Sequence, residues 1–502
     1  MKRILLRILV AMIAALGGAC TVVAIQFFGY QQLLRSPLPL AGTTFSLLLA
    51  LLGTGMSIAP RASWQRWENR LASFWRSLRS TNLPGSHPLA WVVILLSWCC
   101  FILSVTQLWQ VHTDPTSNDP AAFLRYANEV HESGGIATLV SQLFQGTYVQ
   151  ANQHPLFTAL LSLGPTFQQG QLLSLAIGTF TLIVTTLLVA RTWNLTVAAI
   201  FSVLLATNYA FCSTSALVTC EGLLTLFVSL TWLVLAQGDL TTTSSPSSSP
   251  RNALVIGALL ALAFLTKGTG PLFLLITLAW VTGCHLYHRP VTDQQRRLLP
   301  WRRLVLILAA WIVVASPLLT RNVRMFSNPI YNANSYFLFL DDFEDLRQVA
   351  DRMSVREAAQ DYLATHSVAD MLQRETQGLS WQSFIFVRSL GPIPLDDSRI
   401  LLSLPLLLLA LIGMLSEHRP ATILLLAWIA CFLFMFAWYL PIAAGQRFMV
   451  PLLPALLVCA AVGLARIAPT HRRLTKLNST SWLSIGICWC IGWTIITCLM
   501  LP

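Results

Sequence analysis

The chain has 502 residues, of which 55% are hydrophobic and only 10% are charged, and its formal net charge is +12 at pH 7. A soluble domain carries about 25% charged residues, so this composition excludes a protein whose whole surface faces water and indicates a polytopic membrane protein. The basic residues lie in short segments between apolar runs rather than in a stripe with interleaved aromatic residues, which argues against nucleic acid as a partner and is typical of orientation signals.

The predicted fold class is all-α, because a helix needs about 17–25 apolar residues to cross a bilayer and the sequence offers many such stretches. We expect about thirteen transmembrane helices, near residues 5–29, 39–59, 89–110, 171–191, 195–211, 222–237, 252–266, 270–288, 303–318, 400–415, 420–440, 447–465 and 480–500. The segment 155–168 is shorter and contains the Gly164-Pro165 pair. We interpret it as a half-helix that enters from the outer face and does not cross.

Basic residues assign the two sides of the membrane, because lysine and arginine accumulate in cytoplasmic loops. Such residues are dense at the N-terminus and in the loop 61–88, so both are expected in the cytoplasm. The parity of the spans then places the outer loop 111–170, with juxtamembrane helices, and the acidic segment 319–398 on the opposite face. The acidic segment contains two capping-box patterns, Ser354 to Glu357 and Ser367 to Asp370, which predict a small outer helical subdomain.

Four regions follow from this assignment. They are an N-terminal two-span region with its basic cytoplasmic loop, a transmembrane module that includes the outer loop and is expected to be catalytic, the outer subdomain, and the C-terminal transmembrane helices, at residues 1–88, 89–318, 319–398 and 399–502.

Polar residues gather at the predicted outer ends of the spans, which indicates a cavity at the outer membrane interface. The set consists of Asp119, His154, Glu221, Lys267, Arg321, Asn322, Gln446 and Arg447. A carboxylate facing such a cavity can take a proton from an attacking hydroxyl, while lysine and arginine can hold a phosphate and stabilise it as it leaves. Together with apolar flanks for a lipid tail, the set suggests group transfer from a lipid-linked phosphate.

Several of these residues also have a purely structural explanation. Lysine and arginine near the end of a span commonly extend to the headgroups. Asp119 before Pro120 fits an N-cap with proline at the first helical position, and His154 before Pro155 fits a cap of the half-helix. Glu221 is harder to explain in this way, because a charge deep in a span costs ~2.5–3.5 kcal/mol and so favours a partner or a wet cavity.

The same residues occur in an ordered set of motifs between about residues 85 and 465. The outer loop fits the pattern D-x3-Y-x3-A-x2-L-x3-G, with phenylalanine in place of tyrosine, at Asp119, Phe123, Ala127, Val130 and Gly134. The later motifs are Gln153-His154-Pro155-Leu156, the acidic Glu221, Leu265 to Gly268, Arg321-Asn322 with Ser327 to Pro329, and Arg447-Phe448 with Pro451 and Pro454. In this set the sequence resembles the C-type glycosyltransferase superfamily, in particular its dolichyl-phosphate-mannose protein mannosyltransferase-like and aminoarabinose-transferase-like bacterial families.

The resemblance implies a glycosyltransferase of the bacterial inner membrane whose active site lies on the periplasmic face. It implies inverting transfer of a sugar from a polyprenyl-phosphate donor to a hydroxyl of a lipid, a glycan or a protein, with Asp119 as the base and Glu221 orienting the acceptor or the base. Contacts with the donor and acceptor would come from His154, Lys267, Arg321, Asn322, Gln446 and Arg447. The family's KPPL-like motif has lost its lysine and first proline at Gln153 and His154.

No cofactor and no essential metal is expected, although Asp119 and Glu221 are of a type that holds divalent cations. Two other kinds of protein fit the composition. One is a transporter or lipid flippase, which would need ionisable residues near the bilayer midplane and broken helices in paired positions. The other is a non-catalytic binder of lipid-linked sugar. The polar residues at one membrane face favour the enzyme over the transporter.

Overall fold

The computed structural model describes residues 87–115, 118–150, 154–237, 250–287, 293–343, 346–391, 399–417, 420–443, 445–470 and 479–500, together with Leu83 and isolated positions between 14 and 54. Every regular element in these residues is a helix, as the sequence predicted. Most of the two expected N-terminal spans, almost all of the loop 61–88, and Gln153 lie outside the described residues.

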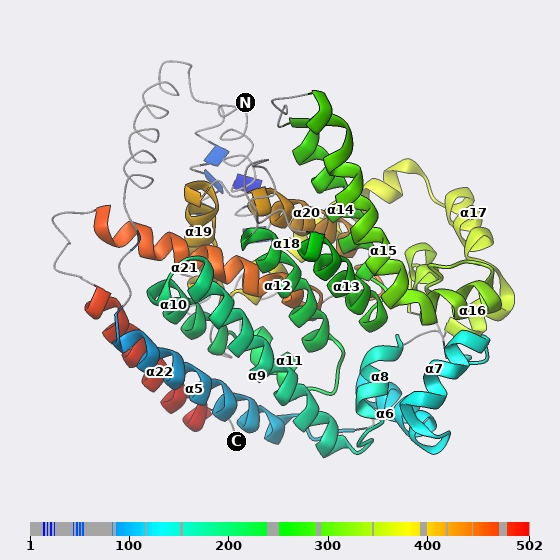
Figure 1. Ribbon diagram of the computed structural model, residues 1–502, viewed down its shortest axis with the longest axis horizontal. Helices are drawn as coiled ribbons and strands as arrows, with labels where there is room; N and C mark the ends of the chain where they lie inside the picture. Colours follow the sequence, from blue (N-terminus) through cyan, green and yellow to red (C-terminus); the bar gives the residue numbers. More distant parts are fainter. Residues whose placement is uncertain are drawn as a thin grey trace.

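The helices form one bundle, and two groups of shorter helices are attached at one end of it (Figure 1). The bundle helices are α5 (Leu89–Val111), α9 (Phe167–Thr192), α10 (Leu195–Ala206), α11 (Tyr209–Ala216), α12 (Glu221–Gln237), α13 (Pro250–Thr266), α14 (Gly270–Tyr287), α15 (Asp293–Phe326), α19 (Arg399–Glu417), α20 (Pro420–Trp438), α21 (Leu453–Thr470) and α22 (Ser479–Met500). The outer loop carries α6 (Asn118–Glu132), α7 (Gly135–Gln145) and α8 (Pro155–Leu161). The acidic segment carries η1 (Ala333–Phe339), α16 (Leu346–Arg352), α17 (Val355–Thr365) and α18 (Val368–Ser389).

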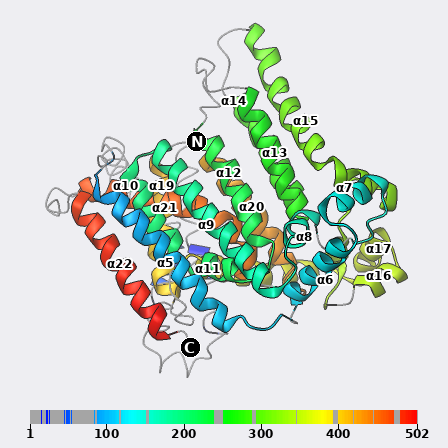
Figure 2. The same ribbon diagram turned by 60° about the horizontal axis from the view of Figure 1, so that its bottom comes forward.

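Five helices of the described chain are long and apolar enough to cross a membrane, or six if the bent pair α10 and α11 counts as one span. Further apolar helices, such as α12 and α13, are shorter. These helices are those of a polytopic membrane protein, and the expected number of about thirteen spans stays a prediction. In Figures 1 and 2, α5 and α22 lie side by side along one edge of the bundle, and the outer-loop helices lie at the other edge, beside α16 and α17.

The predicted span 195–211 is wrong in detail, because the helix breaks near its end. The axes of α10 and α11 differ by 61°. Asn208 causes the restart: its side chain accepts a hydrogen bond from the Phe211 amide at 2.9 Å, as an N-cap does, and its amide nitrogen donates to the Ser389 carbonyl at 2.9 Å. Periodicity alone does not reveal such a break, since both halves are apolar.

Two other spans begin or end elsewhere than predicted. Helix α15 continues to Phe326, so Arg321 and Asn322 belong to its last turns rather than to the start of the outer subdomain. At the other site, two short 3₁₀ turns, η3 (Gln446–Phe448) and η4 (Val450–Leu452), precede α21. Pro451 lies in the second turn, and proline fits the start of a helix better than its interior.

The outer loop folds into helices, as its sequence predicted, and α6 buries one of its faces. Phe123, Ala127 and Val130 of α6 are all buried, and the Phe123 ring meets the Phe157 ring of α8 edge-on at 5.0 Å. Gly134 joins α6 to α7 with φ of 109°, which an L side chain rarely adopts. Helix α8 has seven residues and therefore spans only about 10 Å, too short to cross the bilayer, in agreement with the expected half-helix.

The outer subdomain contains both predicted capping boxes. The Ser354 and Ser367 side chains accept hydrogen bonds from the Glu357 and Asp370 amides. In return, the Glu357 and Asp370 carboxylates accept hydrogen bonds from the backbone amides of the two serines. Helix α18 starts in this subdomain, but its second half, around Phe384, is buried against the bundle. The division of the chain into four regions stays a prediction.

Candidate functional site

Glu221 and Lys267 form a buried ion pair at the predicted outer end of the bundle. Glu221 is the first residue of α12, and Lys267 directly follows α13. The Lys267 Nζ atom donates to Glu221 Oε1 at 2.6 Å, and the two side chains are 22% and 3% exposed. The Cys220 thiol lies against the other carboxylate oxygen, with Sγ to Oε2 at 3.8 Å. A carboxylate this deeply buried is tolerated because a cation and a second donor reach it.

Asp119 and Arg447 form a second ion pair beside the first. Asp119 lies in the first turn of α6, which begins at Asn118, so Asp119 does not occupy the N-cap position considered from the sequence. The positive end of the helix dipole still favours a carboxylate there. The Asp119 and Arg447 side chains are 33% and 43% exposed. This pair is thus open to solvent, whereas Glu221 is closed off.

Phe448 joins the two ion pairs. The Arg447 guanidinium lies over its ring at 5.1 Å, and the Lys267 ammonium lies over the same ring at 5.3 Å. Cations at these distances interact with the ring quadrupole. Arg447 also interacts electrostatically with Glu221. The structure therefore brings together four of the residues singled out in the sequence, Asp119, Glu221, Lys267 and Arg447.

His154 connects the outer loop to this group without touching it. It occupies the N-cap position of α8, but its side chain does not cap that helix. Its Nδ1 atom instead pairs with the Phe264 carbonyl in α13 at 2.5 Å. Burial lowers the pKa of His154 to about 4, and the nearby positive charges of Arg321 and Lys267 act in the same direction. His154 is therefore neutral at pH 7 and fixes α8 against the end of α13.

Arg321 and Asn322 have different surroundings from each other. Arg321 is 3% exposed and donates from one terminal nitrogen to the Gln150 carbonyl at 3.0 Å. Its Nε atom is buried without a hydrogen-bond partner, and in the described chain no carboxylate pairs with it. Asn322 donates to the Pro329 and Tyr331 carbonyls at 3.0 and 3.3 Å, so its amide folds back the loop that follows α15.

Three residues next to the site had no role in the sequence-based predictions. Phe448 belongs to one of the sequence motifs, but the motif does not show that its ring lies between the Arg447 and Lys267 cations. Cys220 precedes Glu221 in the sequence, and its thiol contacts the Glu221 carboxylate. Tyr148 is 6% exposed, and its hydroxyl has no hydrogen-bond partner. It interacts electrostatically with Arg321. An aromatic residue in the polar outer loop was the only available signal for Tyr148.

Gln446 and the possible metal ligands complete the predicted set. Gln446 opens the turn η3, and its carbonyl accepts the Met449 amide at 2.9 Å. Among the described residues, no group of three or more His, Cys, Asp or Glu side chains is arranged to hold a metal ion. Asp119 and Glu221 are each satisfied by a basic side chain. The arrangement offers two carboxylates, each paired with a basic side chain, and one buried arginine.

Neither a protein-family model nor a curated protein sequence matches the chain. Among solved structures, the chain is similar to ArnT from Cupriavidus metallidurans bound to undecaprenyl phosphate, at 17% identity and a TM-score of 0.48 over 83% of this chain and 71% of that one. It is also similar to the archaeal oligosaccharyltransferase AglB from Archaeoglobus fulgidus, at 11% identity and a TM-score of 0.45 over 81% of this chain and 55% of that one.

A further similar structure is the protein O-mannosyltransferase Pmt1-Pmt2 complex of S. cerevisiae bound to its sugar donor, at 15% identity and a TM-score of 0.32 over 54% of this chain and 38% of that one. At these identities and scores, neither the reaction nor a substrate is carried over to this chain.

Proposed function

We propose that this chain is a C-type membrane glycosyltransferase that transfers a sugar from a polyprenyl-phosphate donor to a hydroxyl of a lipid, glycan or protein acceptor. The reaction would take place on the periplasmic face of a bacterial inner membrane. The observation that carries the proposal is the pairing of two carboxylates with two cations around one ring, Phe448. The ordered motifs support the same reaction class, because Asp119 and Arg447 belong to two of them.

Asp119 is the proposed base because it is the more accessible of the two carboxylates. The acceptor oxygen attacks the anomeric carbon from the face opposite the phosphate. The bond between this carbon and the phosphate oxygen breaks, and its electron pair leaves with the polyprenyl phosphate. The acceptor proton passes to Asp119. Attack from the opposite face inverts the configuration, and Glu221 keeps its place through Lys267.

The two ion pairs also suggest how the donor makes the base available. Arg447 holds Asp119 while no donor is bound, and Lys267 holds Glu221 throughout. The phosphodiester of the donor carries one negative charge, as a carboxylate does, and offers more acceptor oxygens, so it competes with Asp119 for Arg447. Transfer of Arg447 from Asp119 to the phosphate would free the Asp119 carboxylate to accept a proton. It would also place a positive charge where the leaving phosphate gains negative charge.

The other predicted residues, Arg321, Asn322, His154 and Gln446, would contribute to the donor site in different ways. Arg321, which lacks a carboxylate partner in the described chain, is a second candidate for the phosphate. Asn322 and His154 hold main-chain carbonyls and would therefore act on substrate binding through the loops that they fix. Gln446 would act through its place beside Arg447 in η3.

The test is a comparison of membrane lipids and glycans between a deletion strain and the same strain complemented with the wild-type chain. We expect one glycosylated species to disappear on deletion, with its sugar-free acceptor accumulating, and to return on complementation. An unchanged set of glycosylated species would contradict the proposal. A change only in the leaflet distribution of a lipid would also contradict it and would favour the flippase.

A further inference from the structure

The geometry points to Arg374 as a positioning residue for the candidate site. Together with Gly378 and Gln382, it holds the last turn of α20 and thereby sets the position of Arg447 and Phe448. The contacts stand on their own, while their consequence for catalysis rests on the proposed function.

Helix α18 supplies the hydrogen bonds that the end of α20 lacks. The last carbonyl groups of a helix have no partner within that helix. Arg374 Nε donates to the Trp438 carbonyl at 2.8 Å, and Gln382 Nε2 donates to the Phe436 carbonyl at 3.2 Å. Residues four positions apart lie on one face of a helix, so a single face of α18 follows the last turn of α20.

Gly378 lies between these two residues on the same face and allows the close approach. A Cβ atom added at Gly378 would lie 1.9 Å from the Ala437 carbonyl oxygen, which is far inside van der Waals contact. The two helices are therefore in main-chain contact at this position. Three successive turns of α18 thus contact the three carbonyls with which α20 ends.

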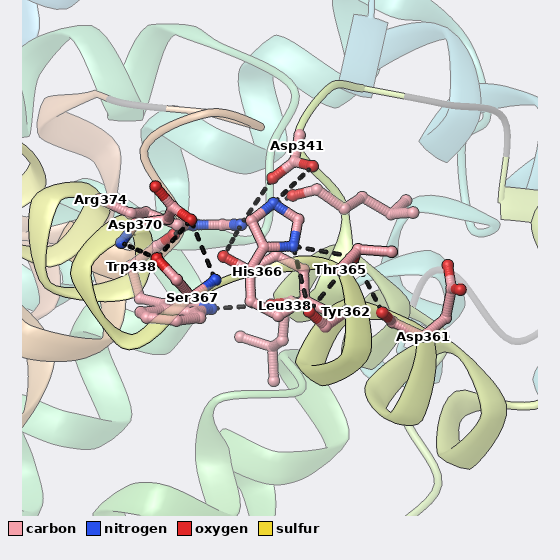
Figure 3. A network of polar contacts seen from close by, with 11 residues as sticks. Leu338, Asp341, Asp361, Tyr362, Thr365, His366, Ser367, Asp370, Arg374 and Trp438 are labelled. Carbon is pink, nitrogen blue, oxygen red and sulfur yellow. Dashed lines mark hydrogen bonds and ion pairs between the residues drawn. The ribbon is translucent and has the colours of Figure 1, made fainter.

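Arg374 also connects this helix end to the outer subdomain, as Figure 3 shows. One terminal nitrogen donates to Asp341 Oδ1 at 3.3 Å and to the Tyr362 hydroxyl at 3.1 Å. The other donates to the Leu340 carbonyl at 3.0 Å. The side chain is only 7% exposed, and all three of its nitrogen atoms are bonded. A guanidinium has the planar, multiply bonding shape that this position uses, and an ammonium does not.

The last turn of α20 in turn holds the aromatic ring at the candidate site. The Phe436 and Phe448 rings are stacked at 4.1 Å. Tyr439, the residue directly after α20, meets the Phe448 ring edge-on at 6.3 Å. Phe448 carries the Arg447 and Lys267 cations on its ring. A shift of the helix end is therefore transmitted through one pair of stacked rings to both cations.

Two roles for Arg374 predict different consequences of its removal. If it only anchors the outer subdomain, its loss loosens α16 and α17. If it positions the site, its loss loosens residues 436–449, which contain the end of α20 and the turn η3. Hydrogen exchange of backbone amides, measured by mass spectrometry on the full chain in lipid nanodiscs, distinguishes the two regions without any knowledge of the substrate.

The experiment compares the wild type with Arg374→Gln, Arg374→Lys and the control Arg324→Gln. Arg324 is also an outer-face arginine that donates to a main-chain carbonyl, that of Gln145, but it lies on α15. We expect Arg374→Gln to speed exchange in residues 436–449 about tenfold, Arg374→Lys to have a smaller effect, and the control to leave this segment unchanged. Binding of undecaprenyl monophosphate should weaken about tenfold in Arg374→Gln.

Unchanged exchange in 436–449, or an equal increase in the control, would overturn the inference. If Arg374→Gln does not fold, Gln382→Leu serves as the second variant. It removes only the bond to the Phe436 carbonyl, and the same segment must respond. A failed proposed function gives a different result: exchange and lipid binding change as expected, but no variant at Asp119 affects glycosylation.

Discussion

Glu221 and Lys267 lie 46 positions apart in the sequence, yet their side chains meet at 2.6 Å where two neighbouring helices, α12 and α13, reach the same end of the bundle. The contact fixes the relative height of these helices. It also places one of the two site cations against the Phe448 ring. Stability and site geometry are therefore coupled in this pair.

Removal of one partner should destabilise the chain strongly. Lys267→Met leaves the Glu221 carboxylate buried without a cation, and breaking a buried pair in this way costs about 3 kcal/mol or more. The double variant Glu221→Gln with Lys267→Met should recover much of the loss, because no buried charge is left. Thermal unfolding of the detergent-solubilised protein measures Lys267→Met, the single variant Glu221→Gln and the double variant. Losses that simply add in the double variant would show that the two side chains do not act as a pair.

Arg447 should matter for transfer more than for stability, because its side chain is 43% exposed and its pair with Asp119 is open to solvent. Arg447→Gln should lower the rate of transfer about a hundredfold, the size expected for loss of a group that stabilises the leaving phosphate. Arg447→Lys keeps the positive charge but loses the two-pronged hydrogen bonding of the guanidinium, so its rate of transfer should lie between those of the wild type and Arg447→Gln. The control is Arg324→Gln on the same face. A rate for Arg447→Gln within twofold of the wild type would exclude Arg447 from the phosphate site.

His154 should make stability depend on pH in the acidic range. Burial lowers its pKa from 6.5 to about 4 in the folded chain, so the unfolded chain binds the proton more readily between these values. The contribution of neutral His154 is therefore complete above pH 6.5 and is lost as the pH falls towards 4, by about 3 kcal/mol in total. Unfolding temperatures of the wild type and of His154→Asn, measured from pH 7.5 to 4.5, give the difference. Parallel curves for the two proteins would contradict this prediction.

The sequence predicted the helical class, the helices of the outer loop and both capping boxes, because these depend on periodicity and on residues three or four positions apart. It also grouped Asp119, Glu221, Lys267 and Arg447 at one face, from the parity of the spans. Their assembly into two pairs follows from the way α6, α12, α13 and η3 pack, and no local pattern encodes that packing.

Other features could not be predicted from the sequence. Asn208 in an apolar run gives no sign that its amide will hold the end of α18. The position of Arg374 against Trp438 depends on two helices that are separated by α19. For His154 and Asn322, the sequence identified polar residues near the site. Their partners are backbone carbonyls, which look the same at every position of a sequence.

Asp119 is the proposed base of the transfer reaction, and its conservative variant Asp119→Asn tests this role most directly. The variant keeps the size of the side chain and removes its ability to take a proton. Wild type and variant are to be reconstituted in membranes from the deletion strain, which contain the accumulated acceptor, and supplied with donor lipids from the parent strain. We predict that transfer by Asp119→Asn falls at least about a hundredfold, with correct membrane insertion and an unfolding temperature close to that of the wild type. Turnover equal to that of the wild type in a correctly inserted variant would contradict Asp119 as the base.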